Sequence, residues 1–462
     1  MTLRVVLALC LASAAMLRAS PAAALTTTTV TQEYEIVATL DVEAGRLDAV
    51  ETLTLTNEAS WAIDHINLSV LSRALGYLSM EAPVTVDGEP ATTAWTTTTN
   101  LRVALGRRLA PGGTAVITVP FGLTLGTSPD AFSARLSSQN GVLSFGHWFP
   151  IVSREHDIYG VGDPQISFTA ERIRLELTTT APQPRDAVAC PGLVSAPEAT
   201  GTSWVCEVET VRDFSFVVNP RFRLTTRQAG ETAIRVYTET VAGDATADLA
   251  RAALTGLGEA FGAYPWPDLV LAEVGASGGF SMEYPRGIHL TRSTVTDPYN
   301  VYHEVGHQWF FAQLGNDQML EPWLDEAFAD FSARYLMGIG EDQCSTRPVD
   351  SSVFAWPAEA ITGGDWTSCD GYFHAVFYQG TEFLNAVRAA MGDQAFFAAM
   401  RQFIEEHRFG FVHDEALLNH LSAQTDADLR PIFERYLAQT DPLRPPPHPG
   451  AAWLLELTPR VR

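Results

Sequence analysis

The chain contains His-Glu-Val-Gly-His at residues 303–307 and, after eighteen further residues, Glu326. Residues four apart on a helix lie on the same face, so His303 and His307 can hold one metal ion together. Glu304 is rotated by about 100° around the helix and can reach a water molecule on that metal. This spacing predicts a metal helix that carries both ligands and a general base.

A catalytic zinc ion takes three protein ligands and keeps one position open. Glu326 stands where a second helix would supply the third ligand beside His303 and His307. Two surface histidines on a charged helix would be the alternative. The neighbours, however, are apolar, which favours a buried face: Val301, Val305, Trp309 and Phe310. We therefore expect one Zn²⁺ per chain.

Bound zinc brings the pKa of its water near neutrality. Glu304 can then take the proton of that water and later give it to a leaving amine. Asp330 lies four residues after Glu326, on the same helix face, and metal-bound imidazoles usually donate their other N–H to a carboxylate. Asp330 is therefore a candidate partner for His303, with a plain surface aspartate as the alternative.

The motif, the gap and the Trp-Leu-Asp-Glu-Ala-Phe-Ala-Asp segment at 323–330 together resemble the aminopeptidase N family of gluzincin zinc metallopeptidases. Upstream, the Phe-Ser-Met-Glu-Tyr-Pro segment at 280–285 is similar to that family's Gly-Ala-Met-Glu-Asn segment, in the Met-Glu-Tyr-Pro form of bacterial branches. The resemblance covers roughly residues 30–440. It implies an α+β chain, with an N-terminal all-β saddle or sandwich domain before a thermolysin-like, mostly helical zinc peptidase domain.

The resemblance also implies a specificity residue. In the family, the glutamate that matches Glu283 binds the free α-amine of a peptide substrate and restricts cleavage to the first peptide bond. A carboxylate facing an ammonium group forms a charge-assisted pair. A surface glutamate at a strand end would be the alternative for Glu283.

One segment departs from the family pattern. Family members place a tyrosine three residues before a glycine, and its hydroxyl stabilises the oxyanion. Here the segment is Phe377-Tyr378-Gln379-Gly380, so the expected position holds Phe377. Tyr378 is the first candidate for the missing donor and His374, one helical turn earlier, is the second. If neither donates, the enzyme is slow or inactive.

These observations predict an exported zinc aminopeptidase with a peptide substrate. A zinc endopeptidase is the alternative if Glu283 is not at the amine site. A zinc-bearing binding protein with impaired turnover is the other alternative, because of Phe377.

The net charge of −24, from 30 basic and 54 acidic side chains, argues against a nucleic-acid partner. No basic stripe is present for an anionic membrane surface.

Residues 1–24 read as a signal peptide, with Arg4, a short apolar run at 5–17 and a small-residue cleavage site at 21–24. The apolar run is too short to span a bilayer, so we expect export to the periplasm or medium without stable membrane insertion.

An exported chain keeps disulfides. Four cysteines allow three connectivities, and local pairing is the simplest, against four free thiols as the alternative. The two expected pairs are Cys190 with Cys206 and Cys344 with Cys369.

The pattern of the chain changes near residue 225. Residues 25–225 carry Val-, Ile- and Thr-rich runs separated by turn residues, which indicate a β domain. Residues 226–440 carry amphipathic helical patterns, which include a metal helix over 298–314 and a second helix over 322–337. Residues 441–462 read as a Pro-rich tail.

Overall fold

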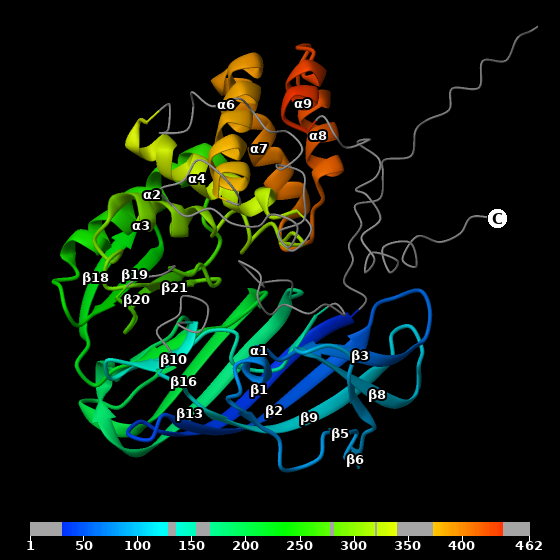
Figure 1. Cartoon of the computed structure of the whole chain (residues 1–462), viewed down its shortest axis with the longest axis vertical. Helices are drawn as coiled ribbons and strands as arrows, with labels where there is room; N and C mark the ends of the chain where they lie inside the picture. Colours follow the sequence, from blue (N-terminus) through cyan, green and yellow to red (C-terminus); the bar gives the residue numbers. More distant parts are fainter. Residues whose placement is uncertain are drawn as a thin grey trace, which may run out of the picture.

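The structure is a computed structural model, and it describes residues 30–127, 135–153, 167–277, 281–318, 321–339 and 373–437. Strands fill the N-terminal half and helices most of the C-terminal half, so the expected α+β class is confirmed (Figure 1). The expected signal peptide and the Pro-rich tail lie outside the described residues, as do Cys344 and Cys369.

The β domain is built on one large twisted sheet. Its strand order is β15-β16-β13-β1-β2-β9-β5-β6, and β4 pairs with β9. The strands are β1 (Val30–Asp41), β2 (Arg46–Asn57), β4 (Leu78–Ser79), β5 (Thr85–Val86), β6 (Glu89–Pro90), β9 (Thr114–Thr124), β13 (Ala170–Pro184), β15 (Leu193–Ser195) and β16 (Thr200–Val211). Alternate residues of β1 and β2 are buried, as the period of a strand with one covered face requires.

Two four-stranded sheets complete this domain. The first has the order β10-β11-β17-β14, from β10 (Leu136–Gln139), β11 (Val142–Phe145), β17 (Phe216–Val218) and β14 (Val188–Ala189). The second has the order β12-β3-β8-β7, from β12 (Ile151–Val152), β3 (Ile63–Ser69), β8 (Asn100–Leu109) and β7 (Thr93–Trp95). Short helical turns lie at α1 (Leu71–Ala74) and η2 (Arg185–Ala187).

A further sheet opens the second domain. Its order is β18-β19-β20-β21, from β18 (Arg223–Ala229), β19 (Thr232–Thr238), β20 (Asp268–Glu273) and β21 (Gly287–Leu290). The boundary expected between residues 225 and 226 falls inside β18. Since β18 pairs with β19 along its whole length, strand pairing assigns all of β18 to the second domain.

Helices pack over this sheet and extend away from the β domain (Figure 1). They are α2 (Asp244–Phe261), α3 (Pro298–Gly306), α4 (Trp323–Met337), the π-helix η4 (Phe373–Tyr378), α6 (Gln379–Met391), α7 (Asp393–His407), α8 (Asp414–Ala423) and α9 (Arg430–Leu437). Among the described helices, none is long and apolar enough to cross a bilayer.

The metal helix is shorter than expected. We predicted a helix over 298–314, but α3 ends at Gly306 and turns follow. The reason lies in three consecutive aromatic residues. Trp309 and Phe310 belong to the core of the helical domain, whereas Phe311 packs into the core of the β domain and has φ +126°. A regular helix cannot direct three consecutive residues into two different cores. The prediction that the helix ends at residue 314 was therefore wrong.

The two domains share packed surfaces. Trp266, Phe311 and Phe411 join the β-domain core from the second domain. Buried Arg212 donates to the carbonyl of Gly410 at 3.1 Å across the same boundary. The two domains therefore meet through a packed, largely apolar interface.

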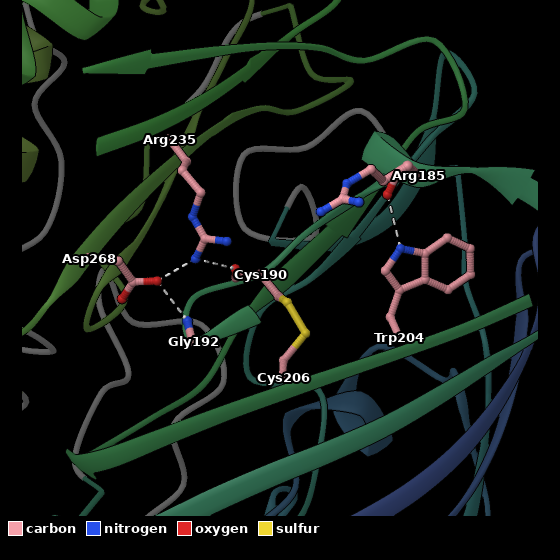
Figure 2. Close-up of a disulfide and its surroundings, with 7 residues drawn as sticks. All are labelled: Arg185, Cys190, Gly192, Trp204, Cys206, Arg235 and Asp268. Carbon is pink, nitrogen blue, oxygen red and sulfur yellow. Dashed lines mark hydrogen bonds and ion pairs between the residues drawn. A yellow bond between two sulfur atoms is a disulfide. The ribbon is translucent and has the colours of Figure 1, made fainter. Parts of the chain in front are cut away.

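The expected Cys190–Cys206 disulfide is present, and it lies beside this boundary (Figure 2). The N–H of Gly192 donates to Asp268 of β20 at 2.8 Å, and Arg235 of β19 donates both to Asp268 and to the carbonyl of Cys190. The disulfide loop is thus tied to the second domain through a buried carboxylate.

Candidate metal centre

Local sequence places His303 on α3 and His307 at the C-terminal cap of this helix. The side chain of Asp297 caps the helix by accepting the N–H of Asn300 at 2.9 Å, and Pro298 occupies the first turn. The helix then presents His303 and His307 one turn apart. Their Nε2 atoms lie 3.1 Å from each other, and both side chains are buried.

Glu326 comes from α4, which packs closely against α3. A Cβ atom at Gly306 would lie 3.1 Å from the Cα of Ala329, so the glycine in the motif permits this close approach. The Oε2 atom of Glu326 lies 3.2 Å from Nε2 of His303 and 3.4 Å from Nε2 of His307. Three donor atoms from two helices therefore converge on one point.

The residues fit a zinc ion. Tetrahedral zinc with bonds of about 2.0 to 2.1 Å holds its ligand atoms about 3.3 to 3.4 Å apart. The three separations found here, 3.1, 3.2 and 3.4 Å, are close to that value. Nδ1 of His307 pairs with the carbonyl of Phe310 at 3.1 Å; as the donor in that bond, it leaves the Nε2 lone pair for a metal.

The electrostatics of the site favour a cation. Burial alone would raise the pKa of Glu326, but hydrogen bonds with His303 and His307 outweigh it and lower that pKa to about 2. Burial lowers the pKa of His303 and so keeps it a neutral ligand. Burial also opposes a charge on His307, yet the charges of Glu283, Glu326 and Glu304 raise its pKa well above the usual value. The same three carboxylates would stabilise a metal ion there.

The structure brings two further carboxylates to this point. Atoms of Glu283, Glu304 and His307 lie within 4.8 Å of one another, and all three residues are buried. Glu283 is held on a short bridge in which Met282 and His289 exchange two backbone hydrogen bonds of 2.8 Å. Glu283 is therefore part of the metal centre and not a surface residue.

We expected Asp330 to contact His303, but the structure shows no such contact. Its carboxylate accepts the hydroxyl of Thr381 at 2.6 Å, Nε of Arg334 at 2.8 Å and the hydroxyl of Tyr299. Nδ1 of His303 has no hydrogen-bond partner among the described residues. Asp330 is linked to His303 through Tyr299, whose ring stacks on His303 at a centroid distance of 5.9 Å. Tyr299 could have been found from the sequence, because it lies four residues before His303 on the same helix.

Phe377 comes to the metal site. Its ring stacks on the imidazole of His303 with a centroid distance of 5.5 Å and an angle of 6°. The ring of Tyr378, next along the π-helix, lies beside the guanidinium of Arg334 at 5.6 Å. His374 lies one turn earlier on that helix and is half-buried. Single π-turns are frequent at functional sites.

Comparison with protein-family models gives a match over about a third of the chain. Residues 291–436 match the Peptidase family M1 domain. The matched segment begins directly after β21 and runs into α9, so it contains all three candidate zinc ligands. Glu283 and the whole β domain lie outside the matched residues.

Curated relatives are similar over part of the chain. The aminopeptidase N of Lactobacillus helveticus is 26% identical over 153 residues, and that of Lactobacillus delbrueckii subsp. lactis is 25% identical over 152 residues. Each match covers 30% of this chain and 18% of the relative. The chain thus spans about a fifth of the length of these two relatives.

Solved structures resemble the whole fold. A two-domain M1 zinc metallopeptidase bound to L-tryptophan has a TM-score of 0.65 at 17% identity, over 91% of this chain and 97% of that one. An M1 zinc metallopeptidase from Deinococcus radiodurans, bound to Tyr-Ser-Ala, has a TM-score of 0.63 with the same identity and coverage. The predicted two-domain architecture is confirmed at this level.

Proposed function

We propose that this protein is a zinc-dependent aminopeptidase that hydrolyses the first peptide bond of peptides. The observation that carries the proposal is the convergence of His303, His307 and Glu326 within 3.4 Å, with Glu304 and Glu283 against the same point. The match of residues 291–436 to the M1 domain supports it.

Each residue has a role in this mechanism. His303, His307 and Glu326 would hold one zinc ion, which when bound would polarise the scissile carbonyl and lower the pKa of the attacking water. Glu304 takes the proton of that water and delivers it to the leaving amine. Glu283 binds the α-ammonium of the substrate, so that the first peptide bond is the one presented.

A donor for the oxyanion is the open part of the mechanism. Phe377 occupies the position against His303 but carries no hydroxyl. We propose Tyr378 as the donor, after a small rotation of the π-helix, with His374 as the second candidate. If neither donates, the protein turns over slowly and acts as a zinc-bearing binding protein.

The Phe377→Tyr variant tests these candidates. Loss of one oxyanion donor costs roughly 100- to 1000-fold in turnover. A large gain in kcat from Phe377→Tyr, with no loss from Tyr378→Phe or His374→Ala, would mean that neither candidate donates. A loss from Tyr378→Phe without a gain from Phe377→Tyr would assign Tyr378.

Export is part of the proposal. Its support is the pattern of residues 1–24 and the Cys190–Cys206 disulfide, since disulfides persist in oxidising compartments. A fractionation of cells that express the full chain would locate it, and protein confined to the cytoplasm would contradict export.

A panel of aminoacyl fluorogenic amides, with and without a zinc chelator, tests the activity. Each peptide substrate would be offered with a free and with an acetylated N-terminus, and zinc would be measured on the same samples. We expect chelator-sensitive cleavage of free-amine substrates. Equal cleavage of acetylated peptides would favour a zinc endopeptidase, and bound zinc without cleavage would favour the binding protein.

A further inference from the structure

The segment that carries Glu283 continues into a tight turn. The N–H of Gly287 donates to the carbonyl of Tyr284 at 2.9 Å, with Pro285 and Arg286 between them. Arg286 has φ +62°, so the third turn position is left-handed. Proline at the second position with a left-handed third residue is the pattern of a type II turn, which favours glycine at the third position. An arginine there indicates that its side chain is needed.

Arg286 is held by a buried carboxylate. Its guanidinium donates from Nε to Asp268 at 2.9 Å, and only 4% of the residue is exposed. Asp268 also binds the N–H of Gly192 in the disulfide loop, seen in Figure 2. This ion pair offsets the cost of the left-handed arginine. The turn is therefore fixed on one side through Asp268.

Gln308 holds the turn on the other side. This residue directly follows the metal ligand His307 and is fully buried. Its Oε1 accepts the N–H of Arg286 at 2.8 Å, and its Nε2 donates to the carbonyls of Tyr284 at 3.2 Å and Glu283 at 3.4 Å. One amide group thus brackets three backbone groups of the segment that carries Glu283.

We infer that Gln308 is a positioning residue that fixes Glu283 relative to the metal ligands and thereby sets the preference for substrates with a free amine. The inference rests on the proposed aminopeptidase function. The backbone of Glu283 and the ligand His307 are joined through the residue next to that ligand. A loosened turn would let the Glu283 carboxylate move away from the substrate amine while the zinc ligands stay in place.

The chain offers a matched control for Gln308. Gln313 is also a fully buried glutamine, and its Nε2 donates to the backbone carbonyl of Gln308 at 3.0 Å. Its side chain makes no hydrogen bond to residues 282–286 in the described structure. Gln308→Met and Gln313→Met therefore remove the same chemical group, but only the first releases the turn. Gln308→Glu, which keeps the acceptor for Arg286, serves if Gln308→Met does not fold.

The first measurement is steady-state kinetics on zinc-loaded protein. Gln308→Met leaves three backbone groups of the turn without their buried hydrogen-bond partner, so it should raise KM for a leucyl amide about 10-fold or more while kcat changes less. Competitive inhibition by leucine should weaken, and inhibition by 4-methylpentanoic acid, which lacks the amine, should not. In a Glu283→Ala background Gln308→Met should change KM less than 2-fold.

The second measurement is amide hydrogen exchange of residues 282–290, which needs no turnover. Exchange there should rise at least 10-fold in Gln308→Met and not in Gln313→Met, with α3 unchanged. Unchanged exchange in Gln308→Met would overturn the inference. If wild-type protein shows no preference for free amines, the proposed function fails, while exchange still decides the role of Gln308. If the preference exists and both variants retain it, the inference fails and the function stands.

Discussion

The helix pair α3–α4 and the strand pair β1–β2 each bury a glutamate, with opposite results. Glu326 on α4 lies between two imidazoles, which lower its pKa to about 2. Glu51 on β2 lies between Ile36 of β1 and Val119 of β9 in the strand register, and neither of its carboxylate oxygens has a hydrogen-bond partner among the described residues. Burial raises the pKa of Glu51 well above its usual value.

The contrast shows what determines the state of a buried acid. The imidazoles that hydrogen-bond to Glu326 keep it ionised, and a carboxylate must be ionised to bind a metal. Glu51 is buried because the alternation of β2 points every second residue inward, between Ala49 and Leu53. Without a hydrogen-bond partner among the described residues, burial favours its neutral form. The same substitution at the two positions should therefore have opposite effects.

The largest effect is expected from Glu326→Gln. A neutral amide replaces the anionic ligand, so zinc affinity should fall and activity should drop to the level of chelator-treated protein. Zinc content by atomic absorption, together with cleavage of a leucyl amide, checks this. Full activity with a full complement of zinc in the variant would show that Glu326 is not a ligand.

Glu304→Gln separates chemistry from metal binding at the same site. The amide cannot take the proton of the attacking water, so kcat should fall by about 10²- to 10⁴-fold. Zinc content should match the wild type. Both quantities are measured on one preparation, and a variant that keeps wild-type turnover would remove Glu304 from the mechanism.

Loss of the disulfide should affect the β domain without changing the metal centre. Cys190 and Cys206 are 16 residues apart, and closing a loop of about 15 residues is worth ~3 kcal/mol in the chain-entropy model. Cys190→Ala with Cys206→Ala should lower the free energy of unfolding by about that amount in urea titrations. Unchanged stability would contradict a structural role for this bridge.

The smallest effect is expected from Glu51→Gln. Its effect on the free energy of unfolding should depend on pH. Burial raises the pKa of Glu51 in the folded state. The stability that this group contributes is therefore fully present below the unfolded pKa near 4.5 and is lost as pH rises toward the folded pKa. A tenfold difference in the acid dissociation constant between the folded and unfolded states corresponds to about 1.4 kcal/mol. The variant, with no charge to ionise, should therefore gain relative stability as pH rises above about 4.5 toward the raised folded-state pKa.

Thermal melts of both proteins across that range measure this gain. Parallel profiles for wild type and Glu51→Gln would mean that Glu51 is ionised or partnered in solution.

Much of the metal centre could be predicted, because helical spacing brings His303 and His307 onto one face wherever the helix goes. The strands of the β domain were also accessible through their alternation. The end of α3 was not, since it depends on which core receives Phe311. The partners of Asp330 and the role of Gln308 come from chain segments that are distant in sequence. No local pattern encodes such contacts.

The arrangement of the large sheet has a consequence for how the chain folds. β1 lies between β2 and β13, and it pairs with β13 in parallel, so Glu33 lies opposite Arg172. Until β13 has been synthesised, one edge of β1 has no strand to pair with. Long-range parallel pairing forms slowly, and an open edge invites pairing with other chains. The nascent chain is thus most prone to aggregation between completion of the β1–β2 hairpin and arrival of β13.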